Sequence, residues 1–508
     1  MGRLSRPATL ALVVLLGAGL RLFPIWFGLP YPHARPDEAT ALGHAAAILA
    51  GDPNPHFFNW PSLTFYAFAG VFGLASLAGR TAVHADLVLI ARAAVAIAGT
   101  ATILVLSRLA SRVADRTTGL VAAFFLSVAV LHVRDSHFAL TDVLMTLLVT
   151  ASLAMLAKAL DTHSLRDVAL AGLLGGLATS TKYTAAAIVA AMAAVQWLWN
   201  QTSRDYRPAL IFLAAFGGGF LAATPFALLD ARTFVADVLF ESRHLSGGHG
   251  TSLGRGWTYH LTRSLPYGLG FGIFAAALAG VIPLARRYRR HALVIGTFAA
   301  AFFVAVGSGQ TVFFRYVMPL VPLACLSAAV AVSHAGGWLA KRARLPQPAA
   351  LALLAFVIGG PSLVDSAWLD LLLARTDTRV IAARWLTPRL RPDDTLHDAG
   401  GDYTRLDYGT TPFHDWRFDA ATKSFGDPAG RTPGWIVLYQ SPLFTYAAID
   451  PALRALVDRE YVLAKEVRGT RDADGSGVYD LQDAFFLPFS RFGTIERPGP
   501  DIRIYRRR

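Results

Sequence analysis

Asp37 and Glu38 are two adjacent carboxylates in the first polar stretch that follows a long apolar segment. Charged side chains beside a membrane core are candidates for function. In a chemical interpretation, one of the two carboxylates is partly removed from water and acts as a general base on a hydroxyl group. In the alternative interpretation, both acids stabilise the first turn of a helix that begins near Ala39. The pair alone does not decide between the two.

Four ionisable residues, Arg134, Asp135, His137 and Asp142, gather before a later apolar stretch. We expect Asp142 about one helical turn inside the membrane, where a carboxylate needs a partner or a role. Arg134 or His137 could pair with it structurally, and a single histidine is more often structural than a ligand. Asp142 is therefore a candidate catalytic residue, and Arg134 and His137 are candidate substrate ligands.

Two cation–aromatic pairs, Lys182-Tyr183 and Arg315-Tyr316, stand at the ends of apolar stretches. Lys182 either extends to lipid head groups or contacts a lipid phosphate. Arg315 suits a phosphodiester because a guanidinium can bind it with two hydrogen bonds, although the pair could also anchor the chain at the membrane interface. All four residues are candidate substrate ligands.

The segment 241–250 is rich in glycine and histidine, which suits a mobile lid over a site. His244 is a candidate substrate ligand there. Glu241, His244 and His249 have side chains that bind metals, but their spacing matches no standard site. We therefore predict no metal site and no cofactor, with a divalent metal as the less expected alternative. The sequence has no phosphate-binding P-loop, dinucleotide-binding glycine motif or nucleophile elbow.

The composition indicates a polytopic helical membrane protein. Hydrophobic residues make up 54% of the 508 residues and charged residues 16%, against roughly 25% charged in soluble domains. The net charge is +13, but arginines cluster in short loops between apolar segments, as in cytoplasmic loops, so nucleic-acid binding is not expected. Cys325 is the only cysteine, which excludes an intramolecular disulfide.

The apolar stretches predict about eleven spans if the basic loops are cytoplasmic. Residues 61–79 are apolar enough to span, but placing them along the interface puts every basic loop inside. This interpretation gives a cytoplasmic N-terminus and an external C-terminus. The predicted spans are 8–28, 84–107, 118–133, 140–160, 168–180, 185–199, 208–229, 264–285, 292–306, 314–334 and 349–368.

The composition changes near Leu369, where charge density rises and apolar runs shorten. We expect an all-α membrane domain over 1–370 and a small extracytoplasmic α/β domain over 371–508. In the second domain, we predict a helix over residues 376–390. The predicted strands are 435–439, 461–467, 477–481 and 502–505.

The layout of these residues resembles the GT-C glycosyltransferases of the protein O-mannosyltransferase and aminoarabinose-transferase type, glycosyltransferase family 39 and its bacterial relatives. The likeness covers most of the first 370 residues. It is carried by Asp37-Glu38, the segment Asn59-Trp60-Pro61-Ser62-Leu63, Asp142, and Arg315-Tyr316 before Pro319 and Pro322.

The resemblance implies a GT-C fold and a polyprenyl-phosphate sugar as donor. An acceptor hydroxyl attacks the anomeric carbon, and polyprenyl phosphate leaves. Asp37 matches the family's catalytic acidic residue in the first loop and is expected to act as the general base. Glu38 is expected to orient Asp37 or the acceptor. Asp142 matches the second acidic position. From their charge and predicted topology, more than from a motif, Lys182 and Arg315 are candidates for stabilising the leaving phosphate.

The sequence therefore predicts a multi-pass glycosyltransferase of the inner (plasma) membrane that acts at its outer face. The expected partners are the bilayer, the polyprenyl-phosphate donor, and a glycan, lipid or protein acceptor. The alternative is a transporter or flippase of a lipid-linked cell-envelope intermediate. Transporters usually place polar residues near the bilayer midplane, whereas the acidic residues here cluster at one face.

Overall fold

The computed structural model describes residues 6–79, 84–201, 204–471 and 477–508, which form two compact units. The first unit contains the chain up to Ile25 and Thr40–Ala367. The second contains Trp26–Ala39 and Trp368–Arg508. The loop with Asp37 and Glu38 is thus part of the unit that contains the C-terminal sheet.

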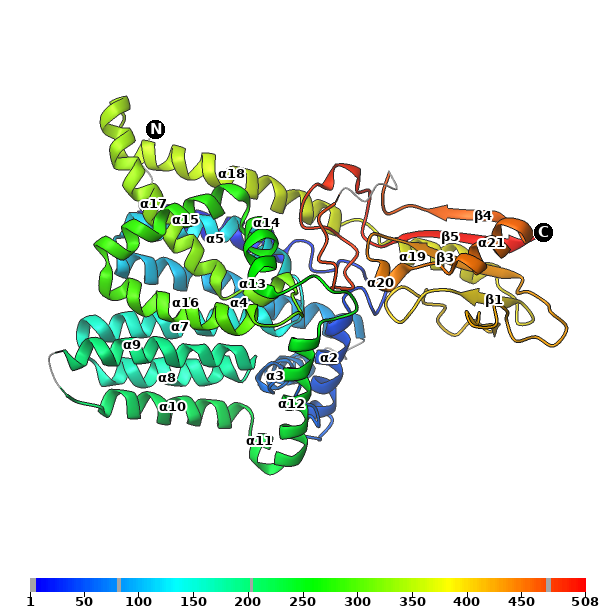
Figure 1. Cartoon of the computed structure of the whole chain (residues 1–508), viewed down its shortest axis with the longest axis horizontal. Helices are drawn as coiled ribbons and strands as arrows, with labels where there is room; N and C mark the ends of the chain where they lie inside the picture. Colours follow the sequence, from blue (N-terminus) through cyan, green and yellow to red (C-terminus); the bar gives the residue numbers. More distant parts are fainter. Residues whose placement is uncertain (1–5, 80–83, 202–203, 472–476) are drawn as a thin grey trace. The chain divides into compact units, whose positions relative to one another are not determined.

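The first unit is almost entirely helical (Figure 1). Its long apolar segments become helices because they can bury apolar side chains on several faces. The longer helices are α1 (Arg6–Leu22), α3 (Leu63–Leu77), α4 (His84–Val113), α5 (Arg116–Val128), α7 (Thr141–Thr162), α8 (Leu165–Thr179), α9 (Ile188–Asn200), α10 (Arg207–Ala223), α12 (Ala231–Gly247), α15 (Phe271–Arg287), α16 (Arg289–Gly307), α17 (Leu320–Ala343) and α18 (Gln347–Leu373). Helix α2 (Pro36–Leu49) begins in the second unit and continues in the first.

Short elements connect these helices. They are α6 (Val130–Asp135), α11 (Phe226–Leu229), α13 (Gly256–Tyr259), α14 (Leu265–Leu269), the π-helical turn η2 (His260–Ser264), and the 3-10 turns η1 (Tyr183–Ala187) and η3 (Phe314–Val317).

Five helices of the described chain are long and apolar enough to cross a membrane, or six if one bent pair counts as a single span. The bent pair, Gly256–Leu269 and Phe271–Arg287, turns by 116°. The expected count of about eleven spans is therefore not confirmed. Apolar composition does not ensure a continuous helix: the predicted span 118–133 breaks at Ala129, whose backbone is extended. The span predicted over 208–229 breaks before Pro225, where α10 ends.

Helix α3 lies within the segment interpreted as interfacial. It has 15 residues, so it is about 22 Å long, shorter than the roughly 30 Å of a hydrocarbon core. This length is compatible with an interfacial segment, which stays a prediction.

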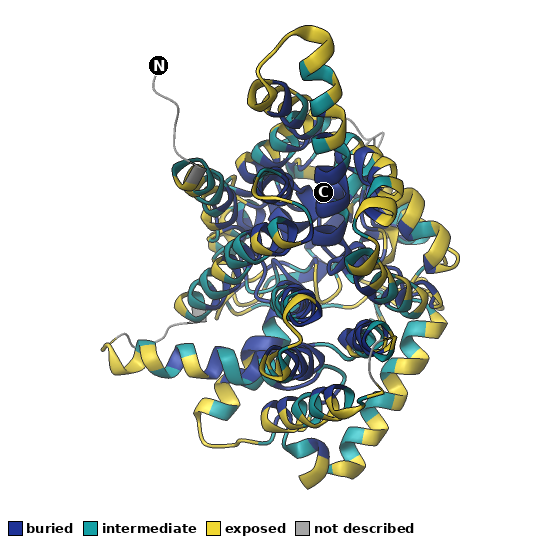
Figure 2. Cartoon of the chain, turned by 90° about the vertical axis from the view of Figure 1, so that its left-hand side faces the viewer, coloured by how far each residue is buried: buried dark blue, intermediate teal, exposed yellow. Residues whose placement is uncertain are grey.

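The helices of the first unit bury the faces that point into the bundle and expose the faces that point outward. Figure 2 shows buried residues concentrated inside the bundle and exposed ones on its outside. Large exposed side chains include Leu210 and Leu213 on α10 and Leu353, Phe356 and Val357 on α18. Lipid is as apolar as these side chains, so such faces suit a bilayer. Small residues let helices approach closely inside: a methyl group on Gly176 of α8 would collide with the backbone oxygen of Phe216 in α10.

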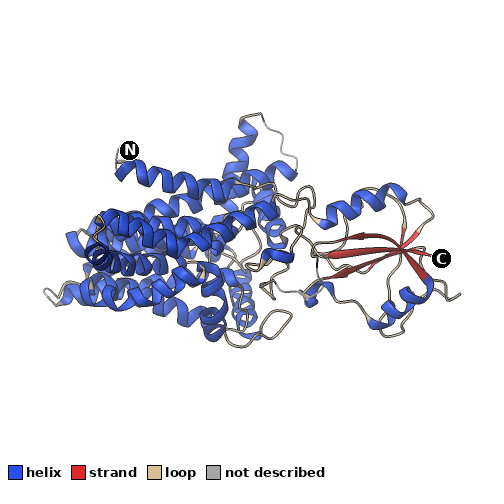
Figure 3. Ribbon diagram, turned by 90° about the horizontal axis from the view of Figure 1, so that it is seen from above, coloured by secondary structure: helices blue, strands red, loops and turns tan. Residues whose placement is uncertain are grey.

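The second unit contains a five-stranded mixed sheet of order β2-β1-β3-β5-β4. Strand β1 (Thr395–Asp398) pairs in parallel with β2 (His414–Asp415) and β3 (Trp435–Gln440). Strand β5 (Asp501–Arg507) is antiparallel to both β3 and β4 (Tyr461–Val467). Figure 3 shows helices on both sides of the sheet.

Alternation along β3 builds a core on each face of the sheet. Val437 and Tyr439 share one cluster with Ala382 and Leu386 of α19 (Thr378–Leu386). Ile436 and Leu438 share the other with Leu453 and Val457 of α21 (Pro451–Glu460). The remaining helical elements are α20 (Phe444–Ala447), η4 (Thr387–Arg389) and η5 (Phe492–Thr494).

The mixed β-sheet domain confirms the predicted helix-and-strand character of the C-terminal region. Three predicted strands coincide with β3, β4 and β5. The strand predicted over 477–481 is wrong: Val478 forms only an isolated bridge with Ser490, while β3 and β4 occupy both edges of β5. Strand β1 was not predicted, because His397 and Asp398 are polar yet buried.

Candidate functional site

The carboxylate of Asp142 faces two cations in the first unit. Its Oδ1 accepts a hydrogen bond from Nζ of Lys182 at 2.7 Å, and its Oδ2 lies 3.8 Å from Nε of Arg315. Their side chains are 3%, 17% and 9% exposed, respectively. An ammonium carries three N–H donors and Asp142 takes one, so Lys182 can also bind a second anion.

Aromatic rings line the two cations. The Nζ of Lys182 lies 4.2 Å from the ring centroid of Tyr316, and the guanidinium of Arg315 lies 4.0 Å from that of Phe313. The two rings meet edge to face at 5.3 Å. Such contacts stabilise a cation without neutralising it, since the ring offers only a quadrupole.

Three separate elements deliver this cluster. Asp142 stands in the first turn of α7, and Arg315 lies in η3. Lys182 lies in the turn between α8 and η1, and its backbone N–H donates to the carbonyl of Ala178. The hydroxyls of Ser180 and Thr224 are 2.5 Å apart, which fixes the same turn against the end of α10. The cluster therefore depends on helix packing and not on one motif.

Tyr183 uses its hydroxyl to hold the chain before α3. The hydroxyl donates to the carbonyl of Phe58 at 2.7 Å, and the backbone N–H of Phe58 donates to Asp237 of α12 at 2.7 Å. The predicted ligand Tyr183 is thus the neighbour of Lys182 that links the turn to the segment around residue 58.

The glycine- and histidine-rich segment packs against the residues that carry Arg315. The carbonyl of His244 accepts from the hydroxyl of Thr311 at 2.6 Å. The ring of His244 contacts that of His249, which in turn lies 5.2 Å from Phe313. In the part of the chain that the structure describes, no three His, Cys, Asp or Glu side chains lie close enough together to hold a metal.

Arg134 and His137 do not contact Asp142 in the described interactions but have partners of their own. The Nη1 of Arg134 lies 3.3 Å from Oδ2 of Asp135, and both side chains are buried. The ring nitrogens of His137 lie 3.0 Å and 2.9 Å from the carbonyl oxygens of Val133 and Phe23. These contacts tie the end of α6 to the residue after α1, which supports a structural role for His137.

The acidic pair belongs to the second unit, where both residues stand in the first turn of α2. This position agrees with the helix-stabilising interpretation and is equally compatible with the chemical one. The side chain of Asp37 is 31% exposed, whereas Glu38 is 3% exposed. Asp37 is thus the more accessible carboxylate of the pair.

Arg35 joins the acidic pair to the C-terminal chain. Its buried guanidinium forms an ion pair with Asp483, and its Nη2 lies 3.9 Å from Oδ2 of Asp37. The ring of Phe485 lies 5.8 Å from the guanidinium carbon. Sequence reasoning missed this role, because Asp483 is far from Arg35 in the chain. An arginine two residues before the acidic pair was the only signal.

Tyr31 and Arg379 make a second junction in this unit. The guanidinium of Arg379 lies 4.3 Å from the Tyr31 ring centroid and donates to both carboxylate oxygens of Asp377, at 2.9 and 2.7 Å. Burial raises the pKa of Tyr31 to about 12, against the opposing effect of Arg379. Its hydroxyl therefore stays protonated and donates to the carbonyl of Arg405 at 2.9 Å. The first loop is held by buried polar contacts at Tyr31 and Arg35.

A protein-family model matches part of the chain. Residues 73–229 match the family model described as dolichyl-phosphate-mannose-protein mannosyltransferase. The matched range contains Asp142 and Lys182. No curated protein sequence matches the chain.

Solved structures of membrane transferases share the fold. The oligosaccharyltransferase of Archaeoglobus fulgidus in the apo form is 14% identical, with a TM-score of 0.54 over 76% of this chain. The chain spans 58% of that protein's length. ArnT from Cupriavidus metallidurans in the apo state is 17% identical, with a TM-score of 0.53 over 97% of this chain and 98% of its own. A second structure of that ArnT, bound to undecaprenyl phosphate, is 16% identical over 98% of this chain and 97% of its own, with a TM-score of 0.53.

At these identities the likeness establishes the fold. It is the fold of GT-C membrane glycosyltransferases, as the resemblance implied, and the chain is an integral multi-pass membrane protein. The roles of individual residues are a matter of proposal.

Proposed function

We propose that the chain transfers a sugar from a polyprenyl-phosphate donor to an acceptor hydroxyl at the outer face of the membrane. The observation that carries the proposal is the cluster in which Asp142 faces Lys182 and Arg315, since it offers two partly buried cations to a phosphate. The fold shared with an ArnT bound to undecaprenyl phosphate supports a lipid-phosphate donor.

In the proposed reaction the acceptor oxygen attacks the anomeric carbon and the bond from that carbon to the phosphate oxygen breaks. The carboxylate of Asp37 takes the hydroxyl proton, and polyprenyl phosphate leaves with the bonding electrons. Lys182 and Arg315 stabilise the charge that grows on the phosphate, which fixed cations in a dry site do better than water.

Supporting roles follow from the contacts. Asp142 holds the two cations in place, and Tyr316 lies against Lys182. From the family resemblance, Glu38 orients the acceptor or Asp37. Arg35 positions Asp37, whose Oδ2 lies 3.9 Å from Nη2 of Arg35. Tyr183 holds the turn of Lys182, while His244 supports the segment before Arg315.

Arg134 is a further candidate ligand of the substrate. A cytoplasmic N-terminus and an external C-terminal unit belong to the proposal, as does a metal-independent reaction.

The transporter alternative is less well supported. Asp142 stands in the first turn of α7 and not near its middle, whereas transporter sites lie near the bilayer midplane.

The proposal is tested by Asp37→Asn in the full chain reconstituted with a radiolabelled polyprenyl-phosphate sugar and a cell-envelope acceptor extract. Transfer should fall at least about 100-fold, because general bases contribute roughly 10²–10⁴-fold. Asp52→Asn removes an acid from the same N-terminal region and should keep near wild-type transfer. Wild-type transfer by Asp37→Asn would reject the assignment of Asp37 as the general base. Transfer that a chelator abolishes and a divalent ion restores would reject metal independence.

A further inference from the structure

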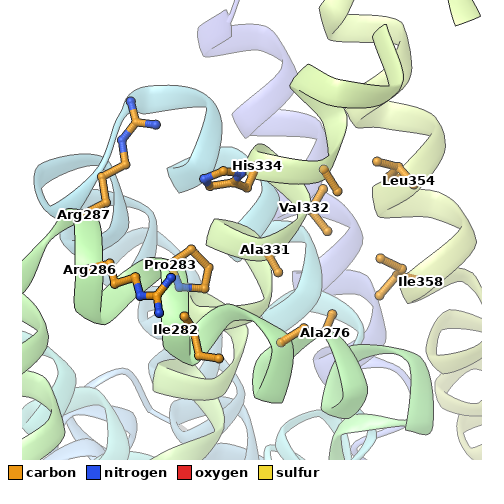
Figure 4. Close-up of a pocket in the computed structure, with 12 residues that line it drawn as sticks. Ala276, Ile282, Pro283, Arg286, Arg287, Ala331, Val332, His334, Leu354 and Ile358 are labelled. Atoms are coloured by element: carbon orange, nitrogen blue, oxygen red, sulfur yellow. The ribbon is translucent and has the colours of Figure 1, made fainter. Parts of the chain in front are cut away.

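Two grooves flank the first half of α18, and the proposed reaction uses neither. The larger has a volume of about 1660 Å³ and runs between α18 and the helices α1, α4, α5 and α7. The smaller, of about 610 Å³, lies between α18, α15 and α17. In Figure 4, Leu354 and Ile358 of α18 point across the smaller groove toward Ala276 and Val332.

Helix α18 contacts its neighbours in both halves. In its second half, the hydroxyls of Ser362 and Ser366 donate to the carbonyls of Leu269 and Val128. In its first half, Leu351 packs against Gly336 of α17, where a Cβ would collide with it. The walls of the larger groove are mostly apolar, with Val13, Leu120, Phe124, Leu351 and Phe356 among the lining residues.

The larger groove ends in basic residues. Arg108, Arg112, Arg116 and Lys158 all line it, together with the acid Asp161. Arg112 pairs with Asp161 at 3.1 Å, and Lys158 pairs with Asp167 at 2.8 Å. Arg108 and Arg116 are exposed, and neither has an ion-pair partner among the residues that the structure describes. The groove therefore combines apolar walls with two available guanidinium groups.

Helix α7 places this basic end far from the Asp142 cluster. Asp142 stands at the start of α7, and Lys158 and Asp161 stand near its end. At 1.5 Å per residue they are roughly 25–30 Å apart along the helix axis, close to the thickness of a hydrocarbon core. The basic end thus lies near the membrane surface opposite to the one that carries the proposed site. The smaller groove also has arginines among its lining residues, Arg286 and Arg287.

We propose that the larger groove binds an anionic phospholipid of the bilayer. Its acyl chains fill the apolar space beside α18, and its phosphate binds Arg108 and Arg116. Basic pockets between membrane helices recognise lipid head groups in this way, and guanidinium groups bind phosphate with paired hydrogen bonds. A phospholipid is a better candidate than a polyprenyl phosphate, because phospholipids make up the bilayer that surrounds the groove.

The test measures lipid binding to the purified full chain in neutral detergent by native mass spectrometry. Phosphatidylglycerol, phosphatidylcholine and undecaprenyl phosphate are titrated separately. Phosphatidylglycerol should bind most tightly, and the double variant Arg108→Gln with Arg116→Gln should bind it about 10–30-fold more weakly, since each arginine near the surface contributes roughly 1 kcal/mol. Both side chains are exposed, so the variant should fold normally.

The matched control is Lys341→Gln with Arg342→Gln, which removes the same charge from exposed residues outside the groove. It should change the affinity less than about twofold. Equal binding of phosphatidylcholine would show that the arginines select nothing. Equal weakening by the control would show a general surface-charge effect. Tighter binding of undecaprenyl phosphate than of phosphatidylglycerol would show that the groove binds the polyprenyl-phosphate carrier instead. Each of these results overturns the proposal.

Discussion

Asp142 determines how the two cations of the proposed site are presented. Its Oδ1 takes one proton of the Lys182 ammonium, and its Oδ2 lies 3.8 Å from Arg315. Isolated buried cations are costly, and a shared carboxylate reduces that cost while leaving N–H donors of the Lys182 ammonium for a ligand. The arrangement therefore suits a phosphate that arrives and departs during each turnover.

Replacing Lys182 with methionine should test this arrangement. We expect kcat to fall roughly 100-fold, because a fixed cation at a developing charge contributes about that much. Inhibition by added polyprenyl phosphate should weaken at least about tenfold. Both are measured in the reconstituted transfer assay.

The control is Lys341→Met, which removes an exposed lysine at the end of α17. Its kcat and its inhibition by polyprenyl phosphate should match those of the wild type. If Lys182→Met loses thermal stability but keeps kcat and inhibition, Lys182 is structural and does not bind the phosphate.

At the scale of elements, the first turn of α2 depends on the C-terminal chain. Arg35 directly precedes this helix and pairs with Asp483, while Tyr31 contacts Arg379 at the start of α19. Both arginines are buried, so their contacts define one orientation of the loop. The backbone that carries Asp37 is thereby fixed before any substrate binds, which favours a positioned base.

Asp483→Asn should separate positioning from stability. We expect lower kcat with little change in the KM for the donor, because the loop no longer holds Asp37 in one orientation. In an Asp37→Asn background the same substitution should cause little further loss, since residues that act through one another are not additive. The unfolding temperature of each variant is recorded beside the kinetics.

Asp483→Glu, which restores the charge, should recover part of kcat. The control Asp458→Asn removes an exposed acid that pairs with Arg454 on α21 and should leave kcat unchanged. Fully additive losses of Asp37→Asn and Asp483→Asn would mean that Arg35 and Asp483 act independently of Asp37.

At the scale of the molecule, the chain divides into a helical unit and a unit that joins Trp26–Ala39 to Trp368–Arg508. The buried residues Phe27 and Tyr31 come from the short first segment, and Phe485 and Arg379 come from the long one. The C-terminal unit is therefore complete only with a segment from the other end of the sequence.

A peptide of residues 26–39 should stabilise a soluble fragment of residues 368–508. At about ten times its Kd, the peptide should raise the unfolding temperature by about 5 °C, because binding to the folded state alone adds roughly 1.4 kcal/mol. A peptide with Tyr31→Ala and Arg35→Ala should give almost no shift. Equal shifts from both peptides would contradict the role of the two buried contacts. Differential scanning calorimetry measures both.

The sequence by itself determined the class of molecule and much of its local structure. Apolar run length and charge depletion predicted helical membrane segments, since helix formation in a bilayer depends on local composition. Residue types at the ends of those segments indicated Asp37, Asp142, Lys182 and Arg315 as candidates for chemistry. Three of the five strands were predicted from short runs rich in apolar, β-branched and aromatic residues.

Tertiary structure alone decided which of these residues meet. Asp142 pairs with Lys182 and faces Arg315 and not Arg134, because helix packing brings together the start of α7, the turn after α8 and η3. The breaks at Ala129 and Pro225 reduced the number of continuous spans, as backbone geometry is not encoded in apolar content. The burial of His397 and Asp398 concealed β1, since polar residues become interior only when other segments supply their partners. Arg35 and Asp483 show the same principle for the first loop, whose partner lies at the other end of the chain.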